Sequence, residues 1–185
     1  MFNQSLMDAI TYATQKHEGQ RRKVDETPYI AHPYRVAMLL KSYHCADHVV
    51  IAGLLHDIVE DTDGTFAELD HLFGKNVTQL VKYLTEENKT VDWEQRKQHS
   101  IAKIKHAPLE AKLIICADKI DNLQSMLDSE ARLGESIWQA FDRGREHQQW
   151  YYQSMYQSVI YQQNSAQLHP LIQSYKTLLD QFLTK

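Results

Sequence analysis

Residues 53–62 read GLLHDIVEDT and combine four ionisable side chains with aliphatic residues that are typical of a buried helix. The ionisable residues are His56, Asp57, Glu60 and Asp61. At about 100° per residue, they fall on one face of a helix and the aliphatic residues fall on the other. Because burying charge is costly unless a partner compensates it, the segment predicts a helix with a cation site or a reactive site on its polar face.

A solvated helix face is the alternative interpretation, since a His-Asp dipeptide is common and charged faces usually point to water. Two other residues weigh against it. His32 precedes Pro33, which should exclude His32 from helical geometry and start a helix after it. Asp118 follows the apolar run LIICA, where an unpaired carboxylate would be costly. Together, two imidazoles and two carboxylates form a mixture suited to Mn²⁺, Fe²⁺, Zn²⁺ or Mg²⁺: His32, His56, Asp57 and Asp118.

The rest of the chain also reads as helix, because it holds only six glycines and four prolines and no stretch alternates with period two for long. Thr65 and Glu68 match a capping box before a helix that Gly74 should end, and Asp92 with Gln95 matches another helix start. We therefore predict an all-α fold, a single helical bundle in one domain over residues 1–185. Helices are expected at 4–17, after Pro33, at 47–60, 66–73, from Asn76, and at 93–106, 109–127, 141–162 and 171–183.

Composition narrows the class of protein. The chain has 185 residues, 43% of them hydrophobic, and a net charge of −4, a balance typical of one globular domain and unfavourable for general nucleic-acid binding. Cys45 and Cys116 lie far apart and outside any CxxC pattern, which suits a reducing compartment without disulfides. The N-terminus lacks the features of a signal peptide, and no apolar run reaches membrane-spanning length. We expect a cytoplasmic protein that binds neither nucleic acid nor membrane.

Several motifs resemble those of the HD-domain metal-dependent phosphohydrolases, which share the order H…HD…D. The stretches HEGQRRK, TPYIAHP, GLLHDIVEDT, LFGKNVTQLV and ADKIDN look like the hydrolase domain of RelA/SpoT proteins, and most like free-standing small alarmone hydrolases of the metazoan SpoT homologue type. The resemblance covers about residues 4–127, and helices at 135–185 are expected to pack on that core. We interpret the aromatic residues of this C-terminal part as helix packing, with a ring bordering the substrate as the alternative: Trp150, Tyr151, Tyr152 and Tyr156.

The resemblance implies an all-helical HD fold with one divalent metal ion, typically Mn²⁺, with Zn²⁺, Fe²⁺ and Mg²⁺ as alternatives. It implies that the metal ligands are His32, His56, Asp57 and Asp118. It further implies a catalytic pair, Glu60 and Asp61, and substrate contacts from Arg22, Lys23 and Asn122. One departure concerns the loop between Lys23 and Pro28, which reads VDET and lacks the glycine that many relatives carry there.

The reaction that the resemblance implies is hydrolysis of the 3′-diphosphate of guanosine tetra- or pentaphosphate (ppGpp or pppGpp) to GDP or GTP and pyrophosphate. Glu60 and Asp61 would handle the water molecule and its proton, because two close carboxylates push one pKa upward. One alternative is an HD phosphohydrolase acting on a nucleoside monophosphate or on the 2′-phosphate of NADPH. Another is a non-catalytic nucleotide-sensing module. The chain is too short to add a synthetase domain, so we expect it to degrade alarmones and not to make them.

Overall fold

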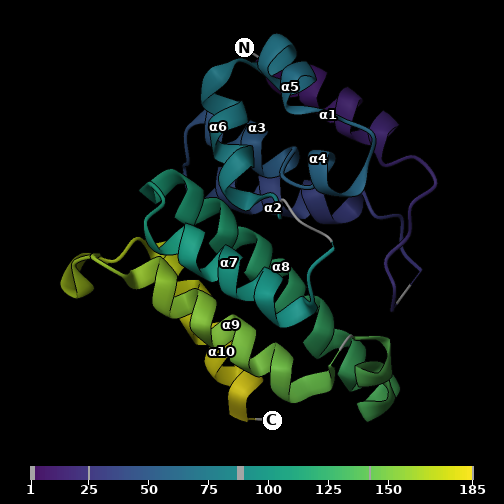
Figure 1. Cartoon of the computed structure of the whole chain (residues 1–185), viewed down its shortest axis with the longest axis vertical. Coiled ribbons are helices and arrows are strands. Elements are labelled where there is room, and N and C mark those ends of the chain that lie inside the picture. Colours follow the sequence, from purple (N-terminus) through teal and green to yellow (C-terminus); the bar gives the residue numbers. More distant parts are fainter. Residues whose placement is uncertain (1–2, 25, 87–89, 142, 185) are drawn as a thin grey trace.

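Helices dominate the computed structural model, which describes residues 3–24, 26–86, 90–141 and 143–184 (Figure 1). Within these ranges no β-strand forms, and an isolated antiparallel bridge joins Arg21 to Pro28. The predicted all-α helical bundle is therefore confirmed. In chain order the elements are α1 (Gln4–Lys16), α2 (Ala31–Ser42), α3 (Asp47–Leu54), α4 (Ile58–Asp61), α5 (Phe66–Phe73), α6 (Lys75–Leu84), α7 (Trp93–Lys105), α8 (Leu109–Leu133), the 3₁₀ helix η1 (Gly134–Ala140), α9 (Gly144–Ile160), the 3₁₀ helix η2 (Ser165–Gln167) and α10 (Pro170–Thr184).

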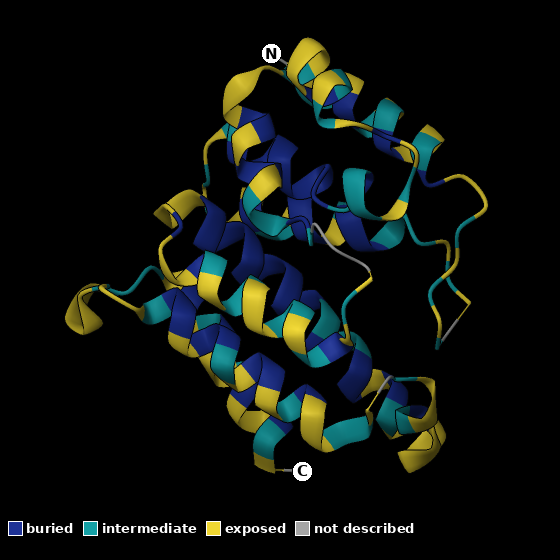
Figure 2. Cartoon of the chain, viewed as in Figure 1, coloured by how far each residue is buried: buried dark blue, intermediate teal, exposed yellow. Residues whose placement is uncertain are grey.

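The long helix α8 lies at the centre of the bundle. It packs against α2, α3 and α6 on one side and against α9 and α10 on the other, so that α1–α6 and α7–α10 form two groups in Figure 1. Its apolar run is buried, with Ile114, Cys116 and Ala117 fully enclosed (Figure 2). Because α8 contacts both groups, a side chain on it can meet side chains from the N-terminal helices deep in the protein.

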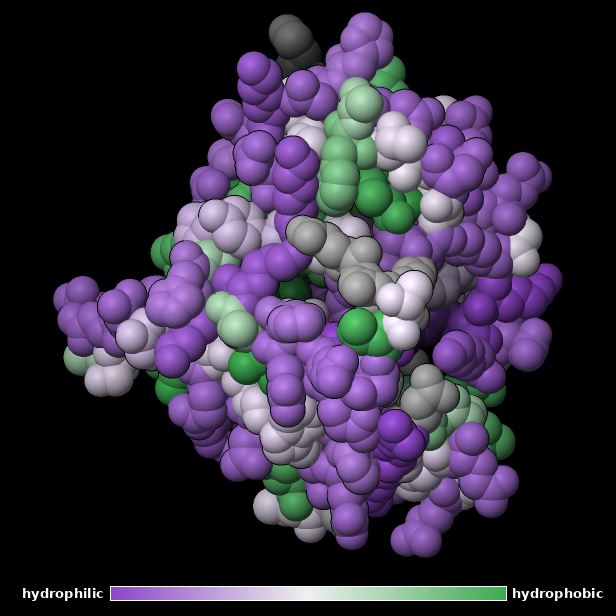
Figure 3. Space-filling model, viewed as in Figure 1, coloured by the Kyte–Doolittle hydropathy of each residue, from purple (hydrophilic) through white to green (hydrophobic). Residues whose placement is uncertain are grey.

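The outer surface contrasts with this core. The face in Figure 3 is mostly hydrophilic, and its hydrophobic residues form small separate patches. Apolar residues scattered singly in this way are normal on protein surfaces. In the part of the chain that the structure describes, no helix combines the length and the apolar character needed to cross a membrane. Cys45 and Cys116 are free cysteines.

The predicted helix starts around α5 and α7 are confirmed. Thr65 accepts a hydrogen bond from the Glu68 backbone N–H, and the Glu68 carboxylate accepts one from the Thr65 backbone, which completes a capping box. Gly74 ends α5 with a φ of 83°, a conformation that glycine adopts readily. Asp92 accepts a hydrogen bond from the Gln95 backbone N–H at the start of α7.

Replacing Thr65 with alanine should lower the free energy of unfolding by about 1 kcal/mol, because an amide at the start of α5 loses its side-chain acceptor. In a chain of this length, such a change lowers the melting temperature by about 2–4 °C. Differential scanning calorimetry of the parent and the variant measures this shift. Thr65→Ser keeps the hydroxyl and should melt close to the parent; equal melting of all three proteins would contradict the role of the cap.

Two predicted boundaries near the candidate site are wrong. His32 belongs to the first turn of α2, where the absent N–H of Pro33 costs nothing because no intrahelical acceptor exists there. The helix predicted at 47–60 is interrupted: α3 ends at Leu54, and α4 begins at Ile58, whose N–H donates to Leu55. In the turn between them, the His56 ring donates from Nδ1 to the Gly53 carbonyl over 2.7 Å. The ring thus satisfies an acceptor at the end of α3 that a continuous helix would have used.

The C-terminal boundaries also differ. Helix α8 continues six residues beyond the predicted 127, to Leu133, and Gly134 stops it with a φ of 71°. The helix predicted at 141–162 is shorter, since α9 runs from Gly144 to Ile160, and residue 142 lies outside the described residues. Pro108 is the N-cap residue of α8.

Candidate metal centre and active site

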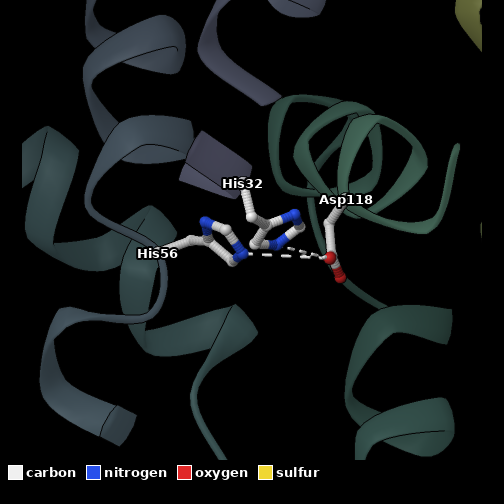
Figure 4. A group of neighbouring side chains, drawn as sticks. All are labelled: His32, His56 and Asp118. Atoms are coloured by element: carbon white, nitrogen blue, oxygen red, sulfur yellow. Dashed lines mark ion pairs between the residues drawn. The ribbon is translucent and has the colours of Figure 1, made fainter. Parts of the chain in front are cut away.

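Three side chains from separate elements converge at the buried junction of the two helix groups. They are His32 on α2, His56 in the turn after α3, and Asp118 on α8, with exposed fractions of 1%, 4% and 6%. Figure 4 shows both imidazoles pointing toward the Asp118 carboxylate. The distances from Asp118 Oδ1 to Nε2 are 3.3 Å for His32 and 3.8 Å for His56. One ligand atom from each of the three residues lies within 4.8 Å of the others, so the group could hold a metal ion.

Asp57, the fourth residue of the predicted set, lies beside this group. Its Oδ2 is 3.2 Å from His56 Nε2 and 3.6 Å from His32 Nε2. The same oxygen accepts a 2.7 Å hydrogen bond from the Tyr29 hydroxyl. All four predicted side chains are therefore neighbours. Asp57 differs from the other three because its Oδ2, the oxygen nearest the imidazoles, also accepts a hydrogen bond from a tyrosine.

The hydrogen bonds of the two imidazoles suit a metal ion. A carbonyl only accepts, so His56 must carry hydrogen on Nδ1 to bond Gly53, and in the neutral ring Nε2 then keeps its lone pair. That buried Nε2 has no hydrogen-bond partner among the described residues. His32 Nδ1 lies 2.6 Å from Asp121 Oδ2, so its Nε2 likewise faces the cluster. Both rings present the nitrogen that a divalent cation would need.

The charges of the cluster also suit a bound cation. Burial lowers the pKa of His32, but hydrogen bonds and charge from Asp118, Asp121 and Asp57 outweigh burial and raise it to about 9. Burial opposes ionisation of Asp118 as well, yet the adjacent Lys119 ammonium and both imidazoles hold its pKa well below the usual range. The cluster therefore favours a positive charge between its imidazoles and carboxylates, which a proton or a divalent cation can supply.

The predicted catalytic pair sits on α4, next to this cluster. Glu60 lines a polar cavity of about 230 Å³ together with His32, His56 and Asp118. Its Oε2 accepts a hydrogen bond of 3.0 Å from the Glu86 backbone N–H, and burial raises the pKa of Glu60 to about 7. Asp61 lines the same cavity and lies 3.3 Å from the Tyr29 hydroxyl.

A second cavity of about 560 Å³ adjoins the first. Its lining includes Arg22, Lys23, Met126, Phe141 and Tyr152. The two cavities share lining residues at their junction: Tyr29, Asp61 and Asn122.

Asn122 links the loop that carries Arg21, Arg22 and Lys23, called the basic loop below, to the His-His-Asp cluster. It accepts a 3.1 Å hydrogen bond from Arg22 Nη2 and donates one of 2.5 Å to Asp118 Oδ1. All three predicted substrate residues, Arg22, Lys23 and Asn122, therefore lie at one opening beside the cluster.

The basic loop turns tightly without the glycine that many relatives carry. The Arg22 N–H donates to the Thr27 carbonyl, and Arg21 Nη1 donates to the Glu26 carbonyl over 2.6 Å. Glu26 adopts a φ of 57°, in the left-handed region that favours glycine. A non-glycine residue thus occupies this strained conformation. Residue 25 of the loop lies outside the described residues.

Sequence reasoning missed three residues that contact the predicted ligands. Tyr29 binds Asp57, Lys119 Nζ lies 2.7 Å from Asp118 Oδ2, and Asp121 binds His32. Asp121 carried a usable signal, because residues three apart on a helix share a face and Asp118 was already a candidate. Tyr29 meets Asp57 from 28 positions away, so its role depends on a contact between distant segments. Lys119 pairs with Asp118, its immediate neighbour in sequence.

The C-terminal aromatic residues take part in helix packing, and some of them also border the candidate site. Tyr151, Tyr152 and Tyr156 are buried in the core, whereas Trp150 is 37% exposed. Lys119 Nζ lies 5.1 Å from the ring centre of Tyr151 and 5.8 Å from that of Tyr152. Tyr151 lines the smaller cavity and Tyr152 the larger one, so α9 packs on the core and also borders the candidate site.

Comparisons with known proteins agree with this geometry. The HD domain family model matches residues 9–146. Proteins named guanosine-3′,5′-bis(diphosphate) 3′-pyrophosphohydrolase MESH1, from Drosophila melanogaster and Homo sapiens, are each 41% identical over 124 residues, which is 65% of this chain and 69% of theirs.

Two solved structures share the fold. The Listeria monocytogenes protein lmo0812 is 40% identical, with a TM-score of 0.77 over 83% of this chain and 99% of its own. A metazoan ortholog of SpoT, described as hydrolysing ppGpp, is 28% identical with a TM-score of 0.80 over 98% of this chain and 97% of its own. The shared fold thus extends through the C-terminal helices, beyond the segment where sequence similarity was evident. Because the family match spans most of the chain, the chain belongs to the HD-domain family, as its motifs predicted.

Proposed function

We propose that the protein is a metal-dependent hydrolase that removes the 3′-diphosphate of guanosine tetra- or pentaphosphate and releases pyrophosphate. One observation carries the proposal: a polar cavity at the His-His-Asp cluster shares Tyr29, Asp61 and Asn122 with a larger cavity that Arg22 and Lys23 line. The smaller cavity suits a diphosphate, and the larger one, with Phe141 and Tyr152, suits a nucleoside. The similarity to relatives named for this reaction supports the choice.

We assign the metal to His32, His56, Asp57 and Asp118, with Mn²⁺ as the expected ion. When bound, a divalent cation would polarise a phosphoryl oxygen and make water more acidic at neutral pH. Glu60 is the candidate for moving the proton, because a pKa of about 7 lets a carboxyl group both accept and release a proton at neutral pH. Asp61 would orient the attacking water from the junction of the cavities. Asn122 would hold Arg22 toward the phosphates.

Identification of products tests the proposed function. The purified, Mn²⁺-loaded protein is incubated with ppGpp, pppGpp, nucleoside monophosphates and NADPH, and the products are separated by chromatography. We expect pyrophosphate with GDP or GTP. Orthophosphate from a monophosphate or from NADPH would instead support an HD phosphohydrolase of different specificity, and binding without turnover would support a nucleotide sensor.

Replacing Arg22 or Lys23 with alanine should raise KM more than it lowers kcat, because each cation neutralises a highly charged substrate in the ground state as well as in the transition state. A rise of roughly tenfold in KM corresponds to about 1.4 kcal/mol of lost binding. Steady-state kinetics measures both constants. Lys75→Ala, on the exposed start of α6, removes the same charge elsewhere and should leave both unchanged. Parental kinetics in both loop variants would place these side chains outside the substrate site.

We further infer that residues 1–185 work as one domain, because α10 packs on α8, the helix that carries Asp118. The cytoplasmic location and the absence of nucleic-acid binding stay predictions from the sequence.

A further inference from the structure

We propose that Asp121 and Arg35 are positioning residues that set the metal affinity of the site through His32. The inference rests on the proposed metal site and adds two residues outside the four proposed ligands. Asp121 Oδ2 accepts a 2.6 Å hydrogen bond from His32 Nδ1, on the side of the ring away from Asp118. The Asp121 carboxylate is buried, with a side-chain exposure of 9%.

Arg35 holds this carboxylate from the outer side. Its Nη2 donates to Asp121 Oδ2 over 3.0 Å, and its Nε donates to Oδ1, so the guanidinium forms hydrogen bonds with both carboxylate oxygens. A bidentate pair of this kind restricts the orientation of the carboxylate as well as adding energy. Asp121 therefore cannot turn away from His32 without breaking two further hydrogen bonds.

The arrangement follows from the spacing on two packed helices. On α8, Asp121 comes three residues after Asp118, and on α2, Arg35 comes three residues after His32. Residues three apart share a helix face, and α2 packs against α8. Each helix thus contributes one proposed ligand and, about one turn later, one residue of the supporting pair.

A carboxylate behind a metal-binding imidazole has two effects. It keeps hydrogen on Nδ1, so that Nε2 points its lone pair at the metal, and its negative charge makes that lone pair a better donor. His56 has only the neutral Gly53 carbonyl in the corresponding place. The two imidazoles are therefore unequal, and His32 is the ligand whose donor strength depends on a charged neighbour.

The affinity for Mn²⁺, measured by isothermal titration calorimetry on the full chain, tests the inference. Asp121→Asn keeps the size of the side chain and removes its charge, and it should weaken Mn²⁺ binding about 10- to 100-fold. Arg35→Ala should weaken binding less. The double variant should resemble Asp121→Asn alone, because Arg35 acts through Asp121. Asp128→Asn removes an exposed carboxylate about two turns further along α8 and should bind Mn²⁺ like the parent.

A second measurement separates positioning from simple structural support. The absorption spectrum of the Co²⁺-loaded protein reports the ligand field, and it should change in Asp121→Asn and not in Asp128→Asn, with both variants folded by circular dichroism. Parental Mn²⁺ affinity and a parental Co²⁺ spectrum in Asp121→Asn would overturn the inference while leaving the proposed function intact. If the parent itself bound neither ion, the metal site and the proposed function would fall first, and this inference with them.

Discussion

Glu60→Gln is expected to lower kcat at least about a hundredfold, the lower end of the range for a general acid or base. Glutamine keeps the size of the side chain and can still accept the hydrogen bond from the Glu86 backbone, but it cannot take up a proton. Steady-state kinetics with Mn²⁺ at pH 7 measures the loss. Asp61→Asn should behave similarly, and the double variant should lose much less than the product of the two effects if the carboxylates act as a unit.

Metal content and melting temperature are the controls for this result. In the Mn²⁺-loaded Glu60→Gln protein, the metal content should stay near the parent's and the melting temperature should not fall, because Glu60 is outside the proposed ligand set. Loss of metal together with activity would make Glu60 a ligand instead. Turnover close to the parent's would mean that the charges of GLLHDIVEDT form a solvated face.

In the metal-free protein, Glu60→Gln should also change how the melting temperature depends on pH. Burial raises the pKa of Glu60 from 4.5 to about 7, so the folded state holds this proton more tightly than the unfolded state does. The resulting stabilisation is fully present below about pH 4.5 and is lost as the pH rises through about 7. Glutamine stays neutral, so the variant should melt like the parent near pH 4.5 and higher than the parent at pH 8. The difference in stability should be at most roughly 3 kcal/mol.

Removing the metal should abolish activity and lower the melting temperature. Without a divalent cation, the carboxylates of Asp57 and Asp118 each lie 3.2–3.8 Å from the Nε2 atoms of the two buried imidazoles. A ligand present at a hundred times its Kd stabilises the folded state by about 2.7 kcal/mol, which in a chain of this length corresponds to a fall of about 5–10 °C on removal. Treatment with a chelator, followed by calorimetry and activity measurements, tests both expectations, and added Mn²⁺ should restore both.

A ligand variant complements the chelator experiment. His56→Ala should lose activity to the background and should no longer gain stability from Mn²⁺, whereas His71→Ala, on the exposed surface of α5, should respond like the parent. If the protein as purified held no metal, and added Mn²⁺ changed neither activity nor melting, the assignment of His32, His56, Asp57 and Asp118 as ligands would be wrong.

The sequence by itself determined the helical class, several helix ends and the candidate ligands. These features depend on local rules. The Thr65 capping box and the stop at Gly74 each involve only a few neighbouring residues. His56, Asp57 and Asp118 emerged as candidates because charge inside an apolar run is costly, and His32 emerged because it precedes Pro33.

Only the tertiary structure decided how those residues are oriented and supported. A turn at His56 replaces the predicted continuous helix, and in this turn the ring donates from Nδ1 to the Gly53 carbonyl of α3. Asp121 supports His32 from 89 positions away, and Tyr29 holds Asp57 from 28 positions away. A helical pattern shows which residues share a face, but it does not show which residues of another helix lie opposite. The roles of Asp121 and Tyr29 follow from contacts between segments that are distant in sequence, which no local pattern records.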